Sequence, residues 1–533
     1  MQKKGFSMAM AAFLAGTMAL SAGCGPSDPG VIDNGEYLEG SIEVKIALAG
    51  YGTEWLKSIA NAYESAYPGC LVDVKEVQDR NSLSAQIVSS ANTADIVVVV
   101  DSIFSRQADG YLVDISDVLK ETPDGFETSS YDRMNPSLRE FYETDDGKFY
   151  QLPWVSGYKG YVYNKTTLDE LYGEGNYTLP RTTDEFLEMC QDILDTSKAK
   201  GSVVYPTIFT VADTYASFLL DTLWWQYSGE TRDQFYWGYL PVKNADGTTT
   251  YRKCETVEDF RNLMYGDPGR EKSLEFFEKV LLSAEFGGYA HPECDKMNFQ
   301  EAQTSFFGNG YGTNMSKSAF MICGDWLNKE MGDTADDSDV RFMRMPILSA
   351  ITKTLESNIT EGQLRAVVDA IDRGDAYDAS LGVTEADYAR LTECRFSGMV
   401  SGDSHVMAIP KLKRNGETKY ELAKQFLKYV LSEEGQALFV IDQNGLNMPY
   451  GFDTTGFLTN EFTDSVRDVT NDWNYHMVVN YSYKSPLGYA GGLACPGYIE
   501  SMFFRADEDA EEMLERFNER NILQADNFLR LIV

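Results

Sequence analysis

The sequence is poor in the residues that metal sites and nucleophilic catalysis most often use. It has three histidines and eight cysteines in 533 residues, and no two cysteines form a C-x-x-C pair. The histidines lie far apart, so there is little material for a zinc site or a Ser-His-Asp triad. The cysteines are dispersed, and the seven that remain without Cys24 are an odd number, unlike a disulfide framework. We therefore expect mostly buried free thiols and no cofactor.

Positive charge is also scarce, and phosphate-binding motifs are absent. These two observations argue against nucleic acids and against nucleotides as ligands. The chain has 46 lysines and arginines against 82 aspartates and glutamates, a net charge of −36. Proteins that bind nucleic acid take much of their affinity from basic patches, so we expect no nucleic-acid partner. Neither glycine-rich phosphate motif, G-x-G-x-x-G or G-x-x-x-x-G-K-[ST], is present, and "GNGYGT" at 308–313 lacks the strand–helix context of a nucleotide site.

The longest apolar run lies at the N-terminus. Two lysines precede an uncharged stretch from 6 to 20, and small residues lead to Cys24. This is the layout of a secretory signal peptide, and the run is shorter than the ~20 apolar residues of a transmembrane helix. The segment resembles a bacterial lipoprotein signal, in which the cysteine becomes the lipidated N-terminus. Such signals usually have leucine where this chain has Ser21, so an ordinary cleaved signal with an incidental cysteine is the alternative.

The residues after Cys24 fit an anchored protein. Two acyl chains give stable membrane anchoring where one is marginal. The stretch up to Gly40 is rich in glycine, proline, serine and aspartate, which is typical of a flexible tether. We predict a signal peptide over 1–23, a tether over 24–40, and a protein held by a lipid anchor on the extracytoplasmic face of the cell membrane.

The folded part begins with alternating strands and helices. Alternating apolar residues predict a strand over 42–48, and helical spacing predicts a helix over 55–66. A second strand over 71–77 and a helix over 82–90 follow. The continuous apolar run "DIVVVVD" at 95–101 is typical of a parallel strand buried on both faces. This order predicts an α/β fold with right-handed crossovers.

Ligands of such sheets bind outside the carboxyl ends of the strands. The loops at 49–54 and 101–104 follow the first and third predicted strands, so they should meet at one edge. Tyr51, Glu54 and Ser102 are therefore candidate ligand contacts, although Glu54 could instead cap the helix that follows.

Motifs along the chain resemble the family 1 extracellular solute-binding proteins of ABC importers, the group that contains the maltose-binding proteins. They are "ADIVVVVDSIFSRQADGYLVDIS" (94–116), "GKFYQLPWVSGYKGYVYNK" (147–165), "FMICGDW" (320–326), "MPIL" (345–348) and "ELAKQFLKYVLSEEGQ" (421–436). Each motif is loose, and their order and spacing carry the resemblance over nearly the whole mature chain. Two departures are a T-T-D-E helix start at 182–185, where the family has T-W-x-E, and apparent extra helices at 348–400.

The resemblance implies a periplasmic-binding-protein-like fold of two α/β lobes with a ligand cleft at their hinge. By analogy, residues 41–152 with 402–446 form the N-terminal lobe. Residues 153–401 with 447–533 form the C-terminal lobe, including a helical extension at about 348–400. The lobes would close over the ligand, and the loaded protein, expected to be a monomer, would dock on ABC permease subunits. The family performs no chemistry on its ligand, so the resemblance implies a binding protein and not an enzyme.

The composition favours a carbohydrate ligand. Aromatic residues make up 13% of the chain, and sugars present C–H faces to aromatic rings and hydroxyls to short polar groups. Trp326 matches the family's ligand-stacking tryptophan, and Asp325 beside it is a candidate hydroxyl acceptor. The further candidates, each of which could instead pack in the core or at the hinge, are Trp154, Tyr158 and Trp225.

Two other functions stay open at this point. A surface glycoside hydrolase would need two carboxylates about 5 to 10 Å apart across the scissile bond, and among 82 acids no such pair can be identified. The same binding fold could also take a peptide or a polyamine, and a polyamine site would place carboxylates beside aromatic rings.

Overall fold

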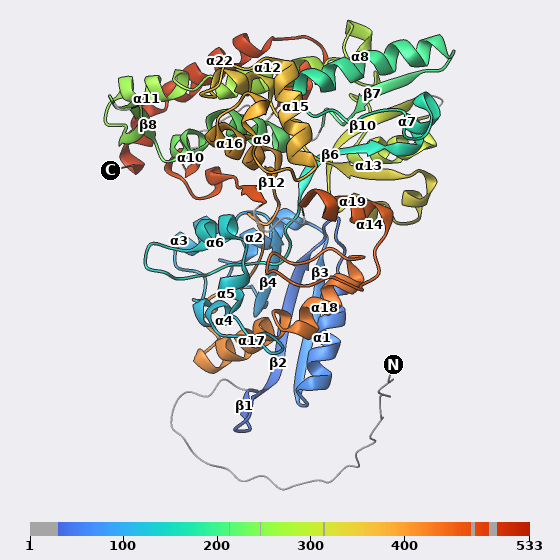
Figure 1. Cartoon of the computed structure of the whole chain (residues 1–533). Coiled ribbons are helices and arrows are strands. Elements are labelled where there is room, and N and C mark those ends of the chain that lie inside the picture. The colour runs from blue at the N-terminus through green and yellow to red at the C-terminus, as the bar shows by residue number, and fades with distance from the viewer. Residues whose placement is uncertain are drawn as a thin grey trace.

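The computed structural model describes residues 30–212, 214–245, 247–312, 315–470, 475–489 and 498–532. Within these ranges the chain forms two α/β lobes, which lie one above the other in Figure 1. Cys24 and the predicted signal peptide lie outside the described residues. None of the helices in the described ranges is long and apolar enough to cross a membrane.

The lower lobe of Figure 1, here the six-strand lobe, is built on one sheet with the order β1-β2-β4-β13-β5 and with β3 paired to β2. Its strands are β1 (Ile32–Asp33), β2 (Leu38–Ala47), β3 (Cys70–Val77), β4 (Ile96–Val100), β5 (Leu152–Pro153) and β13 (His405–Ala408). The central strands β3, β2 and β4 are parallel, as the sequence predicts. Folded structure begins at β1, inside the segment predicted as tether.

Helices cover both faces of this sheet. They are α1 (Glu54–Ala66), α2 (Arg80–Gln86), α3 (Phe104–Ala108), α4 (Ser116–Lys120), α5 (Ser130–Arg133), α6 (Pro136–Tyr142), α17 (Glu417–Val430) and α18 (Glu433–Asp442). The helix predicted over 82–90 is shorter and ends at Gln86. Residues 96–99 of β4 are fully buried, as expected for a strand covered on both faces, and Trp55 of α1 packs in the same core.

The upper lobe, here the four-strand lobe, contains a sheet with the order β11-β6-β10-β7. Its strands are β6 (Lys159–Asn164), β7 (Val204–Ile208), β10 (Lys317–Gly324) and β11 (Val340–Met343). A hairpin, β8 (Tyr239–Lys243) with β9 (Thr249–Lys253), and a short pair, β12 (Ser397–Met399) with β14 (His476–Val478), complete the strands of this lobe in the described ranges. β7 and the hairpin are short runs that lie between long helices along the chain.

The helices of the four-strand lobe surround its sheet. They are α7 (Lys165–Tyr172), α8 (Thr183–Ala199), α9 (Ser217–Ser228), α10 (Glu230–Tyr236), α11 (Val257–Tyr265), α12 (Gly269–Leu281), α13 (Phe299–Thr304), α14 (Leu327–Met331), α15 (Glu361–Asp372), α16 (Glu385–Arg395), α19 (Glu461–Thr470), α20 (Pro486–Tyr489), α21 (Ile499–Phe504), α22 (Ala510–Ile522) and α23 (Ala525–Leu531). All six cysteines of the described ranges are buried free thiols, as the dispersed spacing predicts.

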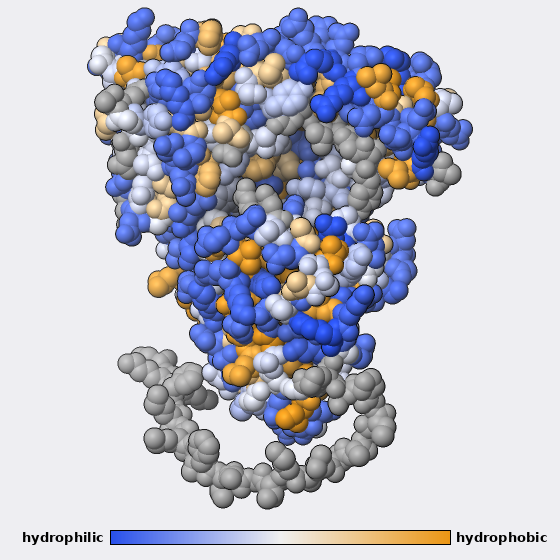
Figure 2. Space-filling view, turned by 180° about the vertical axis from the view of Figure 1, so that it is seen from behind, coloured by the Kyte–Doolittle hydropathy of each residue, from blue (hydrophilic) through white to orange (hydrophobic). Residues whose placement is uncertain are grey.

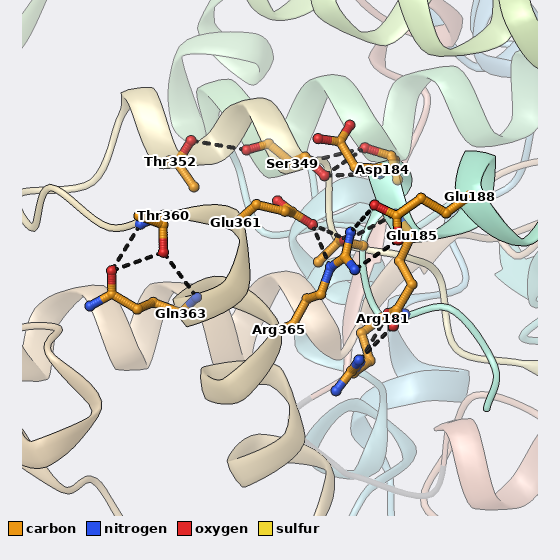
Figure 3. A network of polar contacts seen from close by, with 12 residues as sticks. Arg181, Asp184, Glu185, Glu188, Ser349, Thr352, Thr360, Glu361, Gln363 and Arg365 are labelled. Atoms are coloured by element: carbon orange, nitrogen blue, oxygen red, sulfur yellow. Dashed lines mark hydrogen bonds and ion pairs between the residues drawn. The ribbon is translucent and has the colours of Figure 1, made fainter.

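A polar network attaches the extra helices to this lobe (Figure 3). Arg365 of α15 donates to both carboxylate oxygens of Glu188 on α8, at 2.8 Å each, and to Glu361 at 3.1 Å. A capping box between Thr360 and Gln363 fixes the start of α15. The predicted helical extension thus packs on α8, and its own apolar cluster lies beneath it.

Candidate functional site

A cavity of about 620 Å³ lies between the two lobes. The six-strand lobe lines it with the loop after β2 and the end of β4, including Tyr51 and Asp101, and the four-strand lobe lines it with Lys159, Phe218 and Trp326. The rear face in Figure 2 is hollowed between the lobes. Because β2 and β4 are parallel, their carboxyl ends meet, and the cavity lies at the edge where the strand order places a ligand.

Trp326 is held in place by both lobes. It lies in the turn between β10 and α14, directly before the helix, and it is 8% exposed. A Cβ atom added to Gly50 would lie 2.6 Å from the indole Cδ1, and one added to Gly324 would lie 2.0 Å from Cζ3. Tyr51 and Phe218 pack edge-on against the indole, with ring centroids 6.1 and 6.4 Å away. Two glycines therefore create the space that this ring occupies beside the cavity.

This packing gives the first testable prediction. Gly50→Ala should displace the Trp326 indole and lower the free energy of unfolding by about 1 kcal/mol or more, because overpacking a filled site is destabilising. The measurement is urea unfolding of wild type, Gly50→Ala, Trp326→Ala and the double variant. Once the indole is gone the alanine should cost little, so the two changes should be non-additive. Additive costs would contradict the contact as the cause.

Asp325 joins the two lobes beside the cavity. The hydroxyl of Tyr51 donates to Oδ1 at 2.5 Å, and the backbone N–H of Tyr158 donates to Oδ2 at 3.0 Å. Burial raises the pKa of Asp325 to about 7, although these hydrogen bonds and the Lys159 ammonium act in the opposite direction. Asp325 is buried and does not line the cavity, so the structure gives it a position that orients Tyr51.

Two further predicted site residues, Trp154 and Tyr158, do not line this cavity. Trp154 is 1% exposed and stacks on Trp55 with centroids 5.0 Å apart, while its edge faces Tyr51 at 5.5 Å. Tyr158 lines a separate cavity of about 200 Å³, together with residues of the 445–454 segment. Trp154 therefore packs against Tyr51, Tyr158 lines a different cavity, and neither residue lines the interlobe cavity.

The remaining predicted site residues lie elsewhere. Glu54 is an exposed residue at the start of α1, where it pairs with Lys57 at 2.7 Å. Ser102 is near the rim but does not line the cavity, whereas its neighbour Asp101 does. Trp225 stacks on His476, with centroids 4.0 Å apart, in the apolar cluster of the extra helices. Its helix α9 is buried on nearly every face, so hydrophobic periodicity could not separate core positions from cavity positions.

Several residues that line the cavity were not predicted as ligand contacts from the sequence. They are Gln78, Asp101, Lys159, Tyr215, Phe218, His405 and Tyr483. Among them, Lys159 was the easiest to recognise from the sequence. A lysine at the start of a buried strand that contains tyrosines is unusual unless its charge serves a function. In the described part of the chain, no group of three or more His, Cys, Asp or Glu residues is arranged to hold a metal ion.

Comparison with known proteins identifies the relatives of this architecture. Residues 49–253 match the family model of the bacterial extracellular solute-binding protein. The chain resembles the extracellular solute-binding proteins in both sequence and fold, as its motifs predict. Comparison with curated proteins gave no match.

Solved structures of solute-binding proteins align with most of the chain. A chitin oligosaccharide binding protein has 17% identity and a TM-score of 0.52, over 89% of this chain and 95% of its own. RafE in complex with raffinose has 14% sequence identity and a TM-score of 0.53, and the alignment covers 91% of this chain and 99% of RafE. Maltose-bound MalE3 of T. maritima has 14% sequence identity and a TM-score of 0.54, and the alignment covers 90% of this chain and 98% of MalE3. At these identities the alignments show the fold, and they confirm the predicted two-lobe class.

Proposed function

We propose that this solute-binding protein captures a carbohydrate between its lobes and delivers it, chemically unchanged, to the permease of an ABC importer. The observation that carries the proposal is the interlobe cavity, which aromatic rings of Tyr215, Phe218 and Trp326 line together with polar groups of both lobes. Rings of this kind stack on the C–H faces of sugars. The volume of about 620 Å³ lies within the roughly 300–1,000 Å³ of typical ligand pockets.

The connecting segments support a hinge beside this cavity. The backbone N–H groups of Ser401 and Gly402 donate to the carbonyls of Gly157 at 2.7 Å and Ser156 at 3.0 Å, so two connections lie side by side. The hydroxyl of Tyr450, near the lobe boundary expected at 447, donates to the Pro153 carbonyl at 2.9 Å. We infer that the lobes divide near 152, 401 and 447 and that they close over the ligand by rotation about these segments.

The N-terminal pattern supports the cellular setting of this function. A lipidated Cys24 would hold the protein on the extracytoplasmic face of the membrane, close to the permease that receives the ligand. One copy per ligand is sufficient, because both walls of the cavity come from the same chain.

A thermal-shift screen tests the proposal. The chain from residue 25 onward, which retains all described residues, is heated with oligosaccharides, peptides and polyamines. A ligand at 100 times its Kd adds about 2.7 kcal/mol of stability, so an oligosaccharide should raise the Tm. Chromatography should then recover the sugar intact. Cleavage of the sugar would indicate a glycoside hydrolase, and a shift with only peptides or polyamines would replace the carbohydrate as cargo.

A further inference from the structure

We propose that the captured carbohydrate carries a carboxylate, as a uronic acid does, and that this carboxylate binds the ammonium group of Lys159. The inference rests on the proposed function, and it names the class of sugar that the cavity takes. It is carried by one charged group that lines the cavity beside an aromatic ring and that, among the described residues, has no carboxylate or hydrogen-bond acceptor in contact.

Lys159 is the first residue of β6, just past the segment that connects the lobes. Its side chain is 6% exposed, and the residue lines the interlobe cavity. Nζ lies 4.4 Å from the ring centroid of Phe218, which also lines the cavity. Within the described part of the chain, no hydrogen-bond acceptor or carboxylate contacts this ammonium. The ammonium reaches the cavity, where an anionic ligand would supply the acceptor that the described residues do not.

The acidic groups nearest to Lys159 are engaged with other partners. Asp325 accepts from Tyr51 and from a backbone N–H, as described above. Asp221 forms an ion pair with Arg232 at 2.8 Å. Asp403 accepts through Oδ2 from the backbone N–H of residue 480 at 2.9 Å, while its Oδ1 is buried without a hydrogen-bond partner among the described residues. Burial lowers the pKa of Lys159, and these three aspartates oppose that effect only from a distance.

The acids that line the cavity also have donors from the protein. Asp101 accepts from the Ser84 hydroxyl at 3.1 Å and from the N–H of Ser102 at 2.8 Å. Glu330 accepts from the amide of Gln303 at 2.8 Å. The lining carboxylates are thus stabilised by the fold, whereas the Lys159 ammonium is left for the ligand.

A carboxylate meets this requirement better than a sugar hydroxyl. It compensates the buried charge, and hydrogen bonds between charged partners are roughly twice as strong as those between neutral ones. Tyr215 stacks on Phe218, with centroids 5.0 Å apart, next to the ammonium. A sugar ring on this aromatic pair could turn its carboxylate toward Nζ.

Matched pairs of sugars test the inference. Binding of digalacturonate and galactobiose, and of glucuronosyl-xylobiose and xylobiose, is measured by calorimetry on the chain from residue 25 onward. The wild type should prefer the acidic member of at least one pair by about 30-fold or more, and Lys159→Met should abolish that preference. Lys165→Met is the control, since Lys165 begins α7 directly after the same strand and already pairs with Asp169 at 2.5 Å.

The unliganded Lys159→Met variant should melt at or above the wild-type Tm, because it removes an uncompensated buried charge. Equal binding of acidic and neutral sugars by the wild type would overturn the inference without any variant, and so would an acid preference that survives in a folded Lys159→Met protein. Binding of neutral sugars alone would overturn the inference and leave the proposed function intact. Binding of no saccharide at all would overturn the proposed function itself.

Discussion

Trp326→Ala should weaken carbohydrate binding by about 2 kcal/mol or more, which is a loss of at least about 30-fold in affinity. The indole lines the interlobe cavity and is fixed by Gly50 from one lobe and by Gly324 from the other. A ring that is already held in place pays little entropy when a sugar stacks on it, so its removal should affect binding strongly. Calorimetric titration with the sugar identified in the thermal-shift screen measures the effect.

The loss of a buried aromatic ring also affects folding, and the experiment has to separate the two effects. Aromatic-to-alanine changes in a core cost roughly 3–5 kcal/mol of stability, so binding is measured at a temperature where circular dichroism shows the variant folded. Trp225→Phe is the control, because Trp225 is also buried but packs on His476 and does not line the cavity. It should keep the wild-type affinity. A folded Trp326→Ala protein that binds as tightly as wild type would show that the indole is no platform for the ligand.

The sequence predicted the position of the cavity better than the residues that line it. Alternating hydrophobicity identified β2, and the continuous apolar run identified β4, so their carboxyl ends could be placed at one edge of a sheet. Tyr51 and Trp326 line the cavity at that edge because each lies in the short segment that follows the end of a strand. The local sequence pattern was sufficient to predict these two contacts, since a loop that follows a parallel strand lies at the carboxyl edge of the sheet.

Residues whose surroundings come from distant parts of the chain could not be assigned in this way. The Tyr51–Asp325 hydrogen bond joins positions 274 residues apart, and no local pattern reports it. Trp225 belongs to a helix that is buried on nearly every face, so its periodicity did not distinguish the core from the cavity. Phe218 begins the same helix and does line the cavity. The difference between the two is set by the extra helices that cover Trp225.

The buried carboxyl group of Asp325 should make stability depend on pH in an unusual direction. Its pKa is about 7 in the folded protein and ordinary, near 4, in the unfolded chain. The folded state therefore binds the proton more tightly. Its contribution to the free energy of unfolding is complete below about pH 4 and is lost as the pH rises to about 7. At 1.36 kcal/mol per pKa unit, the loss is about 4 kcal/mol.

Comparison with Asp325→Asn isolates this effect from all other titrations. An asparagine can keep both contacts, because its oxygen accepts from the Tyr158 N–H and its amide donates to the Tyr51 hydroxyl oxygen. Between pH 4 and pH 8, the free energy of unfolding of wild type minus that of Asp325→Asn should fall by about 4 kcal/mol in urea titrations.

Asp387→Asn provides a control of opposite sign. Although burial raises the pKa of Asp387, hydrogen bonds from Ser357 and from the backbone N–H of Glu356 bring it below its ordinary value. Asp387 therefore stabilises the fold above its unfolded pKa, and this contribution is lost as the pH falls through the folded pKa. A wild-type-minus-Asp325→Asn difference that stayed flat or rose with pH would show that Asp325 is ionised throughout. The contact between the lobes would then be a charged hydrogen bond, and protonation of Asp325 would have no part in stabilising the fold.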